Sequence, residues 1–122
     1  LREVYVQPFP GPGRRVLVSS GRGGDEPVWA HNGRELFYRN GERELVTARV
    51  STDGDFVVTG REVLFSAVNF VDLGGEEVEG QQYDVSLDDQ KFLMAEWSGQ
   101  TSGPVVVLNF AEELKRRSAG GR

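Results

Sequence analysis

The apolar residues of this chain come in short runs, and glycine, proline, asparagine or aspartate bounds each run. Between the runs lie dipeptides that supply the tight geometry of a hairpin: Asn32-Gly33, Asn40-Gly41, Asp53-Gly54 and Ser98-Gly99. The 122 residues include 16 glycines and 5 prolines, which leave little room for long helices. The pattern therefore predicts an all-β chain of short strands.

The runs predict nine strands, at Glu3–Pro8, Arg15–Ser19, Pro27–Ala30, Glu35–Arg39, Glu44–Val50, Arg61–Phe65, Tyr83–Ser86, Lys91–Glu96 and Val105–Asn109. Some are apolar at successive positions, as in Leu36-Phe37-Tyr38 and Phe92-Leu93-Met94-Ala95, which is typical of strands covered on both faces. Because the connections are short, we expect sheets stacked face to face. Residues 111–117 carry acids first and bases last and predict a short helix.

Two segments of the chain repeat each other. Pro27–Tyr38 aligns with Tyr83–Met94 at an offset of 56 residues, as between Trp29 and Val85. Repeats of a few tens of residues, each made of short strands, are typical of propeller blades. The length of the offset indicates an insertion at residues 68–82, which is rich in glycine and glutamate.

The repeated segments resemble the blades of the TolB-like, WD-repeat-related β-propeller family. A blade of that family has a short strand ending in Trp-Ser, a Pro-Asp-Gly turn, then Arg or Lys and an apolar strand. Trp29–Arg34 and Val85–Gln90 occupy this slot here, with His31 and Leu87 in place of proline and Asp89 in place of glycine.

The two ends of the chain extend the resemblance. Val4–Gly11 and Val107–Lys115 are similar to the C-terminal end of such propellers in bacterial multidomain proteins. In those proteins the propeller often follows a Ser/Thr kinase or winged-helix domain. The chain starts at Leu1 without an initiator methionine, which fits a section of a longer protein.

The resemblance implies a partial β-propeller of about two and a quarter blades, each a four-stranded antiparallel sheet. Residues 1–24 would form the outer strands of one blade, 25–67 a complete blade, 68–82 a loop insertion, 83–110 an incomplete last blade, and 111–122 a short helix and tail. A ring needs about four to eight blades. We therefore expect either a longer parent propeller or a homo-oligomer formed through the open blade edges.

The charge and composition limit the partners. A net charge of −5 argues against nucleic acid, and Lys115-Arg116-Arg117 is the sort of basic group that ends a solvated helix. No apolar run approaches the ~20 residues of a membrane span, so we expect no membrane insertion. The absence of cysteine excludes disulfides and favours a periplasmic or extracytoplasmic location over a cytoplasmic one.

The sequence predicts no catalytic residue, cofactor or metal. His31 is the only histidine, and we expect it to be a turn residue. Asp84, Asp88 and Asp89 could hold calcium, but their spacing is typical of ordinary turn chemistry. Nucleophile motifs and a phosphate-binding loop followed by a helix are also absent. We therefore expect a protein that is not an enzyme.

The expected function is that of a protein-interaction or sensor module. Its contact surface is predicted at the insertion of residues 68–82 and at the Gly21–Glu26 loop. The candidate contact residues are Phe70, Asp72, Glu76, Glu77, Glu79 and Trp97. Most strand aromatics, including Tyr5 and Trp29, are expected in the core. Two alternatives stay open: a substrate-positioning domain of a Ser/Thr kinase or peptidase, and a glycan- or calcium-binding β domain.

Overall fold

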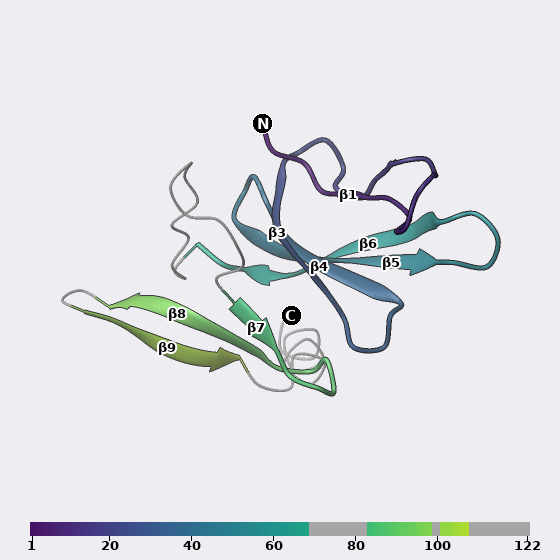
Figure 1. Ribbon diagram of the computed structural model, residues 1–122. Helices are drawn as coiled ribbons and strands as arrows, with labels where there is room; N and C mark the ends of the chain where they lie inside the picture. Colours follow the sequence, from purple (N-terminus) through teal and green to yellow (C-terminus); the bar gives the residue numbers. More distant parts are fainter. Residues whose placement is uncertain (69–82, 99–100, 108–122) are drawn as a thin grey trace, which may run out of the picture. The chain divides into compact units, whose positions relative to one another are not determined.

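The computed structural model describes residues 1–68, 83–98 and 101–107, and beyond Met94 it describes the backbone alone. These residues form an all-β chain with antiparallel sheets, which confirms that part of the prediction (Figure 1). They contain no helix and no closed sheet. The helix predicted at residues 111–117 lies outside the described residues. The strands are β1 (Tyr5–Val6), β2 (Val16–Leu17), β3 (Gly24–Trp29), β4 (Glu35–Asn40), β5 (Glu44–Ser51), β6 (Val57–Ser66), β7 (Tyr83–Val85), β8 (Phe92–Ser98) and β9 (Thr101–Val107).

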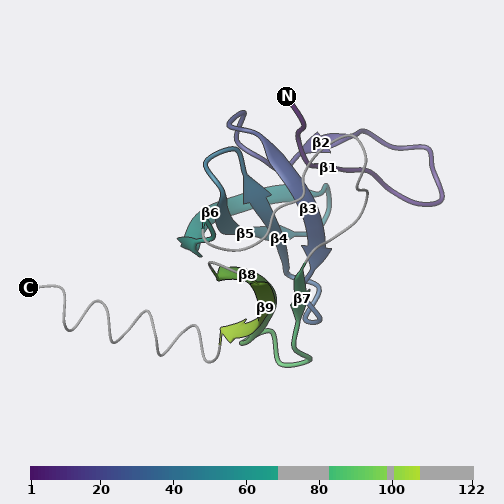
Figure 2. The same ribbon diagram turned by 90° about the vertical axis from the view of Figure 1, so that its left-hand side faces the viewer.

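Within every sheet the strands follow their order in the sequence. The orders are β1-β2, β3-β4-β5-β6 and β7-β8-β9, and all neighbours are antiparallel (Figures 1 and 2). Each of the predicted strands overlaps one observed strand. The chain divides into two compact units: Leu1–Ala67 holds the first two sheets, and Val68–Arg122 holds the third.

The turn between β3 and β4 is closed by backbone and side-chain hydrogen bonds. The Gly33 amide donates to the Ala30 carbonyl (3.0 Å), and the Ala30 amide donates to the Glu35 carbonyl (2.9 Å). The Asn32 side-chain oxygen accepts the amide of Arg34 at 2.8 Å. Gly33 has a φ of 71°, a left-handed conformation that glycine adopts freely.

The turn between β7 and β8 has the same bonds 56 residues later. The Asp89 amide donates to the Ser86 carbonyl (2.9 Å), and the Ser86 amide donates to the Lys91 carbonyl (2.9 Å). The Asp88 carboxylate accepts the amide of Gln90 at 3.0 Å, as Asn32 does for its own neighbour. Asp89 takes the left-handed position with a φ of 60°.

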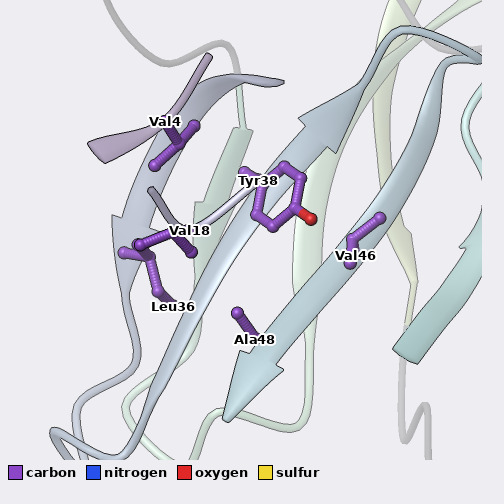
Figure 3. Packing of buried hydrophobic residues seen from close by; sticks show 6 residues of the cluster. All are labelled: Val4, Val18, Leu36, Tyr38, Val46 and Ala48. Atoms are coloured by element: carbon purple, nitrogen blue, oxygen red, sulfur yellow. The ribbon is translucent and has the colours of Figure 1, made fainter. Parts of the chain in front are cut away.

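The segments around β1 and β2 pack on one face of the four-stranded sheet. Val18 donates its amide to the Val4 carbonyl at 2.8 Å, and both side chains belong to one buried cluster with residues of β4 and β5 (Figure 3). The resulting apolar layer consists of Val4, Val18, Leu36, Tyr38, Val46 and Ala48. Full burial of an aliphatic side chain of this size stabilises the folded state by roughly 1.5–3 kcal/mol. The layer therefore holds two sheets face to face within the first unit.

The opposite face of the four-stranded sheet is buried as well. Phe37 and Leu45 alternate with the residues of the apolar layer and are exposed by only 3% and 0%. Arg39 and Thr47 on the same two strands are each 2% exposed. The prediction that strands with successive apolar residues are covered on both faces is confirmed for Leu36-Phe37-Tyr38 of β4.

The third sheet buries one face in the part whose side chains are described. Tyr83 lies opposite Met94 and Val85 opposite Phe92, and all four side chains are buried. Leu93, in contrast, is 45% exposed, so the prediction of coverage on both faces is wrong at this residue. Its directly opposite partner is Asp84, whose charge favours contact with water.

Two aromatic residues predicted in the core are half exposed instead. Tyr5 is 45% exposed and lies under the guanidinium of Arg15, which is 4.2 Å from the ring centroid. Trp29 is 46% exposed and meets Phe56 edge to face, with centroids 6.5 Å apart. Tyr5 lies on the outer face of the β1–β2 pair, whereas Trp29 lies opposite Leu36 at the end of β3, on the face that carries the apolar layer. In both cases one neighbour shields part of the ring and the rest contacts water.

Strand β3 begins three residues earlier than predicted, so the second half of the Gly21–Glu26 segment is strand rather than loop. The Gly24 amide donates to the Arg2 carbonyl at 2.8 Å. A Cβ at Gly24 would lie 2.8 Å from the Cβ of Ser19. This glycine permits close approach of two backbones, whereas the sequence pattern alone indicates a turn.

Candidate functional site

The residues predicted to contact a partner fall largely outside the described part of the chain. This holds for Phe70, Asp72, Glu76, Glu77 and Glu79. Trp97 lies in β8, where its backbone is opposite Ser102 of β9. Their roles stay predictions, and the candidate site is built from other residues.

A groove of about 440 Å³ lies between two connections of the first unit. One connection joins β1 to β2 and the other joins β5 to β6, and they lie beside each other in Figure 1. We call it the hairpin groove. The residues that determine its chemistry are Val6, Gln7, Arg14, Val16, Asp55 and Phe56.

The base of the hairpin groove is apolar and fixed to the core. Val6 and Val16 face each other across the β1–β2 pair. Val6 and Phe56 are partly buried and pack against the apolar layer described above. The base is thus held by strands and does not depend on the loops alone.

The walls of the hairpin groove carry Gln7, Arg14 and Asp55, which are all exposed. Within the described residues, none of these three side chains has a hydrogen bond or an ion pair with the protein. Other exposed arginines of the same unit do pair with carboxylates. Those pairs are Arg2–Asp25 at 3.1 Å, Arg22–Glu42 at 3.4 Å and Arg49–Glu62 at 3.4 Å.

A polar cluster near the start of the chain is satisfied internally. The Ser19 hydroxyl donates to the Glu3 carboxylate and accepts the Val4 amide at 2.9 Å. The other Glu3 oxygen accepts the Gly23 amide at 3.1 Å. Because Ser19 is fully buried, it lacks the access to substrate that a nucleophile needs. The cluster fixes the N-terminal segment to the start of β3.

Tyr38 and Arg61 extend this cluster into the sheet. Burial raises the pKa of the Tyr38 phenol above 10.0, while the Arg61 guanidinium lowers that pKa and the Glu3 carboxylate raises it. Arg61 also donates from Nε to the Val18 carbonyl at 2.6 Å. The phenol therefore stays protonated at neutral pH, and these groups join the N-terminal segment to β4 and β6.

An ion pair is buried on the other face of the sheet. Arg39 Nε lies 3.2 Å from a carboxylate oxygen of Glu26, and the two side chains are 2% and 4% exposed. Glu26 has a φ of 53° and sits where the register of β3 shifts, between Asp25 and Val28. The irregular backbone turns the carboxylate towards Arg39. Removing either partner would leave a buried charge uncompensated.

His31, Asp88 and Asp89 of the sequence analysis occupy turns, whereas Asp84 lies in β7. His31 is exposed in the turn between β3 and β4. The Ser86 hydroxyl donates to Asp88 at 2.5 Å, and this bond is the main reason why the pKa of the Asp88 carboxyl is below its usual value. Among the described residues, no group of three or more His, Asp or Glu is arranged to hold a metal ion. The described residues also include no helix long and apolar enough to cross a membrane.

Sequence reasoning did not identify the hairpin groove. It treated Asp53-Gly54-Asp55 as a connection, Pro10-Gly11-Pro12-Gly13 as a turn and Gln7 as part of the strand Glu3–Pro8. The two connections of the groove lie about 40 residues apart in the sequence, and only the packing of β1 and β2 on the sheet brings them together. The signal visible in the sequence was a charged residue on each connection, Arg14 on the first and Asp55 on the second.

The described residues form an antiparallel all-β protein with an open, partly charged groove. Comparisons with family models, with curated proteins and with solved structures found no match.

Proposed function

We propose that the chain is a section of a β-propeller of the TolB-like kind and acts as a non-catalytic protein-interaction module. The observation that carries this proposal is the face-to-face packing of two consecutive antiparallel sheets in the first unit. Consecutive blades of a propeller pack in this way, with each blade built from strands in sequence order.

The repeated turn supports the same architecture. The turns that precede β4 and β8 have equivalent hydrogen bonds at an offset of 56 residues. The strand register is equivalent too: Trp29 pairs with Leu36 as Val85 pairs with Phe92. Equivalent turns and registers at a fixed offset are expected of repeated structural units.

The chemistry of the hairpin groove favours binding over catalysis. Its walls offer a guanidinium, a carboxylate and an amide, which recognise ligands through hydrogen bonds and charge. The described residues that line it include no serine, cysteine or histidine to act as nucleophile or base. Rigid β scaffolds commonly place binding residues on such connections.

The proposal is tested by measuring the mass of the isolated chain by light scattering after size exclusion, over a wide range of concentration. A ring needs about four to eight four-stranded sheets, which is more than one copy supplies. We expect a mass several times 13.5 kDa that persists on dilution. A folded species of 13.5 kDa at all concentrations would exclude a ring formed by copies of this chain, and a propeller would then require a longer parent chain.

A matched pair of variants identifies the surface involved. Tyr5 and Leu17 lie directly opposite each other on the outer face of the β1–β2 pair, and Leu17 is 39% exposed. In a propeller this face packs on a further blade, so Leu17→Glu should shift the mass towards 13.5 kDa while the circular dichroism spectrum is retained. Leu87→Glu, at a turn residue that is 84% exposed, should leave the mass unchanged. Equal behaviour of the two variants would exclude the β1–β2 face as the interface.

A further inference from the structure

The hairpin groove combines an apolar base with opposite charges on its two walls. Arg14 belongs to the connection before β2, and Asp55 belongs to the connection before β6. The base between them is formed by Val6, Val16 and Phe56. A volume of about 440 Å³ lies within the range of sites that bind small molecules or short peptide segments.

The charges of the groove are available to a ligand. The described residues provide neither Arg14 nor Asp55 with a hydrogen bond or an ion pair, whereas exposed Arg2, Arg22 and Arg49 are each paired. The groove therefore presents a positive wall, a negative wall and an apolar base in one place. A complementary ligand carries an acidic group, an apolar group and a basic group in that order.

We propose that the hairpin groove binds an extended peptide segment of a protein partner, in which an apolar residue lies between an acidic and a basic residue. The acidic residue pairs with Arg14 and the basic residue with Asp55, while the apolar side chain contacts Phe56 and the two valines. This specifies the partner chemistry of the proposed interaction module and rests on that role, but it does not require a closed propeller.

Gln7 makes a peptide a better fit than a free amino acid. Its side-chain amide lies on the groove wall and has no hydrogen bond with the described residues. An amide has a donor and an acceptor, as a peptide bond has, so the two groups can pair with each other. In a free amino acid the α-ammonium and α-carboxylate groups are bonded to the same carbon, so this pair of charges does not span the apolar base between the walls.

The test measures the binding of acetylated and amidated six-residue peptides by isothermal titration calorimetry. The first peptide has lysine and glutamate on either side of a central Val-Leu pair, and its neutral counterpart has glutamine in both charged positions. An exposed ion pair changes affinity by about threefold, so we expect the mixed-charge peptide to bind about tenfold more tightly than the neutral one. The difference should diminish at high salt.

Charge-reversal variants locate the contacts. Arg14→Glu should make the preferred peptide one with lysine in both charged positions, and Asp55→Lys should make it one with glutamate in both. Arg34→Glu is the matched control, because it changes the net charge by the same amount as Arg14→Glu at an exposed residue outside the groove. This control should retain the preference for the mixed-charge peptide.

Several outcomes would overturn the inference. They are absence of peptide binding, a preference that the groove variants do not alter, and binding of free lysine, glutamate or leucine as tightly as the peptide. The last result would assign the groove to a small molecule. A 13.5 kDa monomer that keeps the peptide preference would contradict only the assembly of copies into a ring, and a stable assembly that ignores all peptides would contradict only the peptide site.

Discussion

The four-stranded sheet and the β7–β8–β9 sheet share a turn and a register but differ in how their faces are covered. Leu36 and Phe92 occupy equivalent positions after the turn and are both buried. One residue later, Phe37 is 3% exposed whereas Leu93 is 45% exposed. The turn and the first pairings are thus set by local sequence, whereas the coverage of the second face depends on what packs against it.

The difference also has a chemical component. The residue opposite Phe37 is Val28, and the residue opposite Leu93 is Asp84. An apolar cross-strand pair favours burial, whereas a carboxylate beside a leucine favours contact with water. The four-stranded sheet also buries Arg39 with Glu26 on this face, and the equivalent position in β8 is Ala95. Two similar strand patterns therefore produce one sheet buried on both sides and one sheet with an exposed residue.

The largest expected effect is the difference in the free energy of unfolding between alanine variants of Phe37 and Leu93. Phe37→Ala should lower the free energy of unfolding by about 3–5 kcal/mol, because it removes a buried ring and leaves a cavity. Leu93→Ala should lower it by about 0.5 kcal/mol or less, as surface substitutions usually do. Urea denaturation of the two variants measures both values.

Equivalent buried positions provide the control. Leu36→Ala and Phe92→Ala should each cost about 2–5 kcal/mol, since both side chains are almost fully buried. If Leu93→Ala proved as costly as Phe37→Ala, the second face of the β7–β8–β9 sheet would be covered in solution. The two sheets would then be alike, and the comparison would no longer hold.

The same residues show how far the sequence predicts the fold. The strand order and most turns follow from short apolar runs and residues such as Asn32 and Asp53, because these signals act within a few positions. The exposure of Leu93 and Trp29 was not predictable, since it depends on packing between segments distant in the sequence. The start of β3 was missed because Gly24 is needed for close packing against Ser19, and sequence alone does not distinguish that role from a turn.

The candidate site was less predictable than the fold. Asp88 and Asp89 were correctly assigned to turn chemistry, which is local, whereas Asp84 lies in β7. Arg14 and Asp55 carry no local motif, and their proximity to one groove results from the packing of the β1–β2 pair on the sheet. A groove assembled from two connections has no signature within either connection.

A smaller effect on stability is expected at Gly33 and Asp89, the residues with a left-handed backbone conformation in the two turns. Gly33 has a φ of 71°, and no heavy atom of the described residues lies within 4 Å of the place that a Cβ would take, so Gly33→Ala adds only backbone strain, about 1 kcal/mol. Asp89 has a φ of 60° in the equivalent place, and Asp89→Gly should stabilise the fold by about 0.5 kcal/mol. The gain is small because glycine also increases the entropy of the unfolded chain. Thermal unfolding compares the two variants, and a loss of stability in Asp89→Gly would show that the aspartate side chain matters more than its φ.

The smallest expected effect is a pH dependence of stability that Asp88 contributes and Asn32 does not. Both side chains accept an amide two residues later, but only Asp88 can be protonated. Its hydrogen bond from Ser86, and then the amide of Gln90, hold the pKa of the carboxyl below 3.8 in the folded state. Its contribution to stability is therefore complete above the unfolded pKa and is lost as the pH falls through the lower, folded pKa.

An NMR titration of the Asp88 carboxyl carbon measures this pKa directly. Asp88→Asn keeps an acceptor oxygen, as in the first turn, and removes the titrating group. The variant should therefore lose less stability than the wild type between neutral pH and pH values below 3.8. An identical acid dependence in both proteins would mean that the carboxylate does not hold the second turn, and the equivalence between the two turns would then rest on their backbone bonds alone.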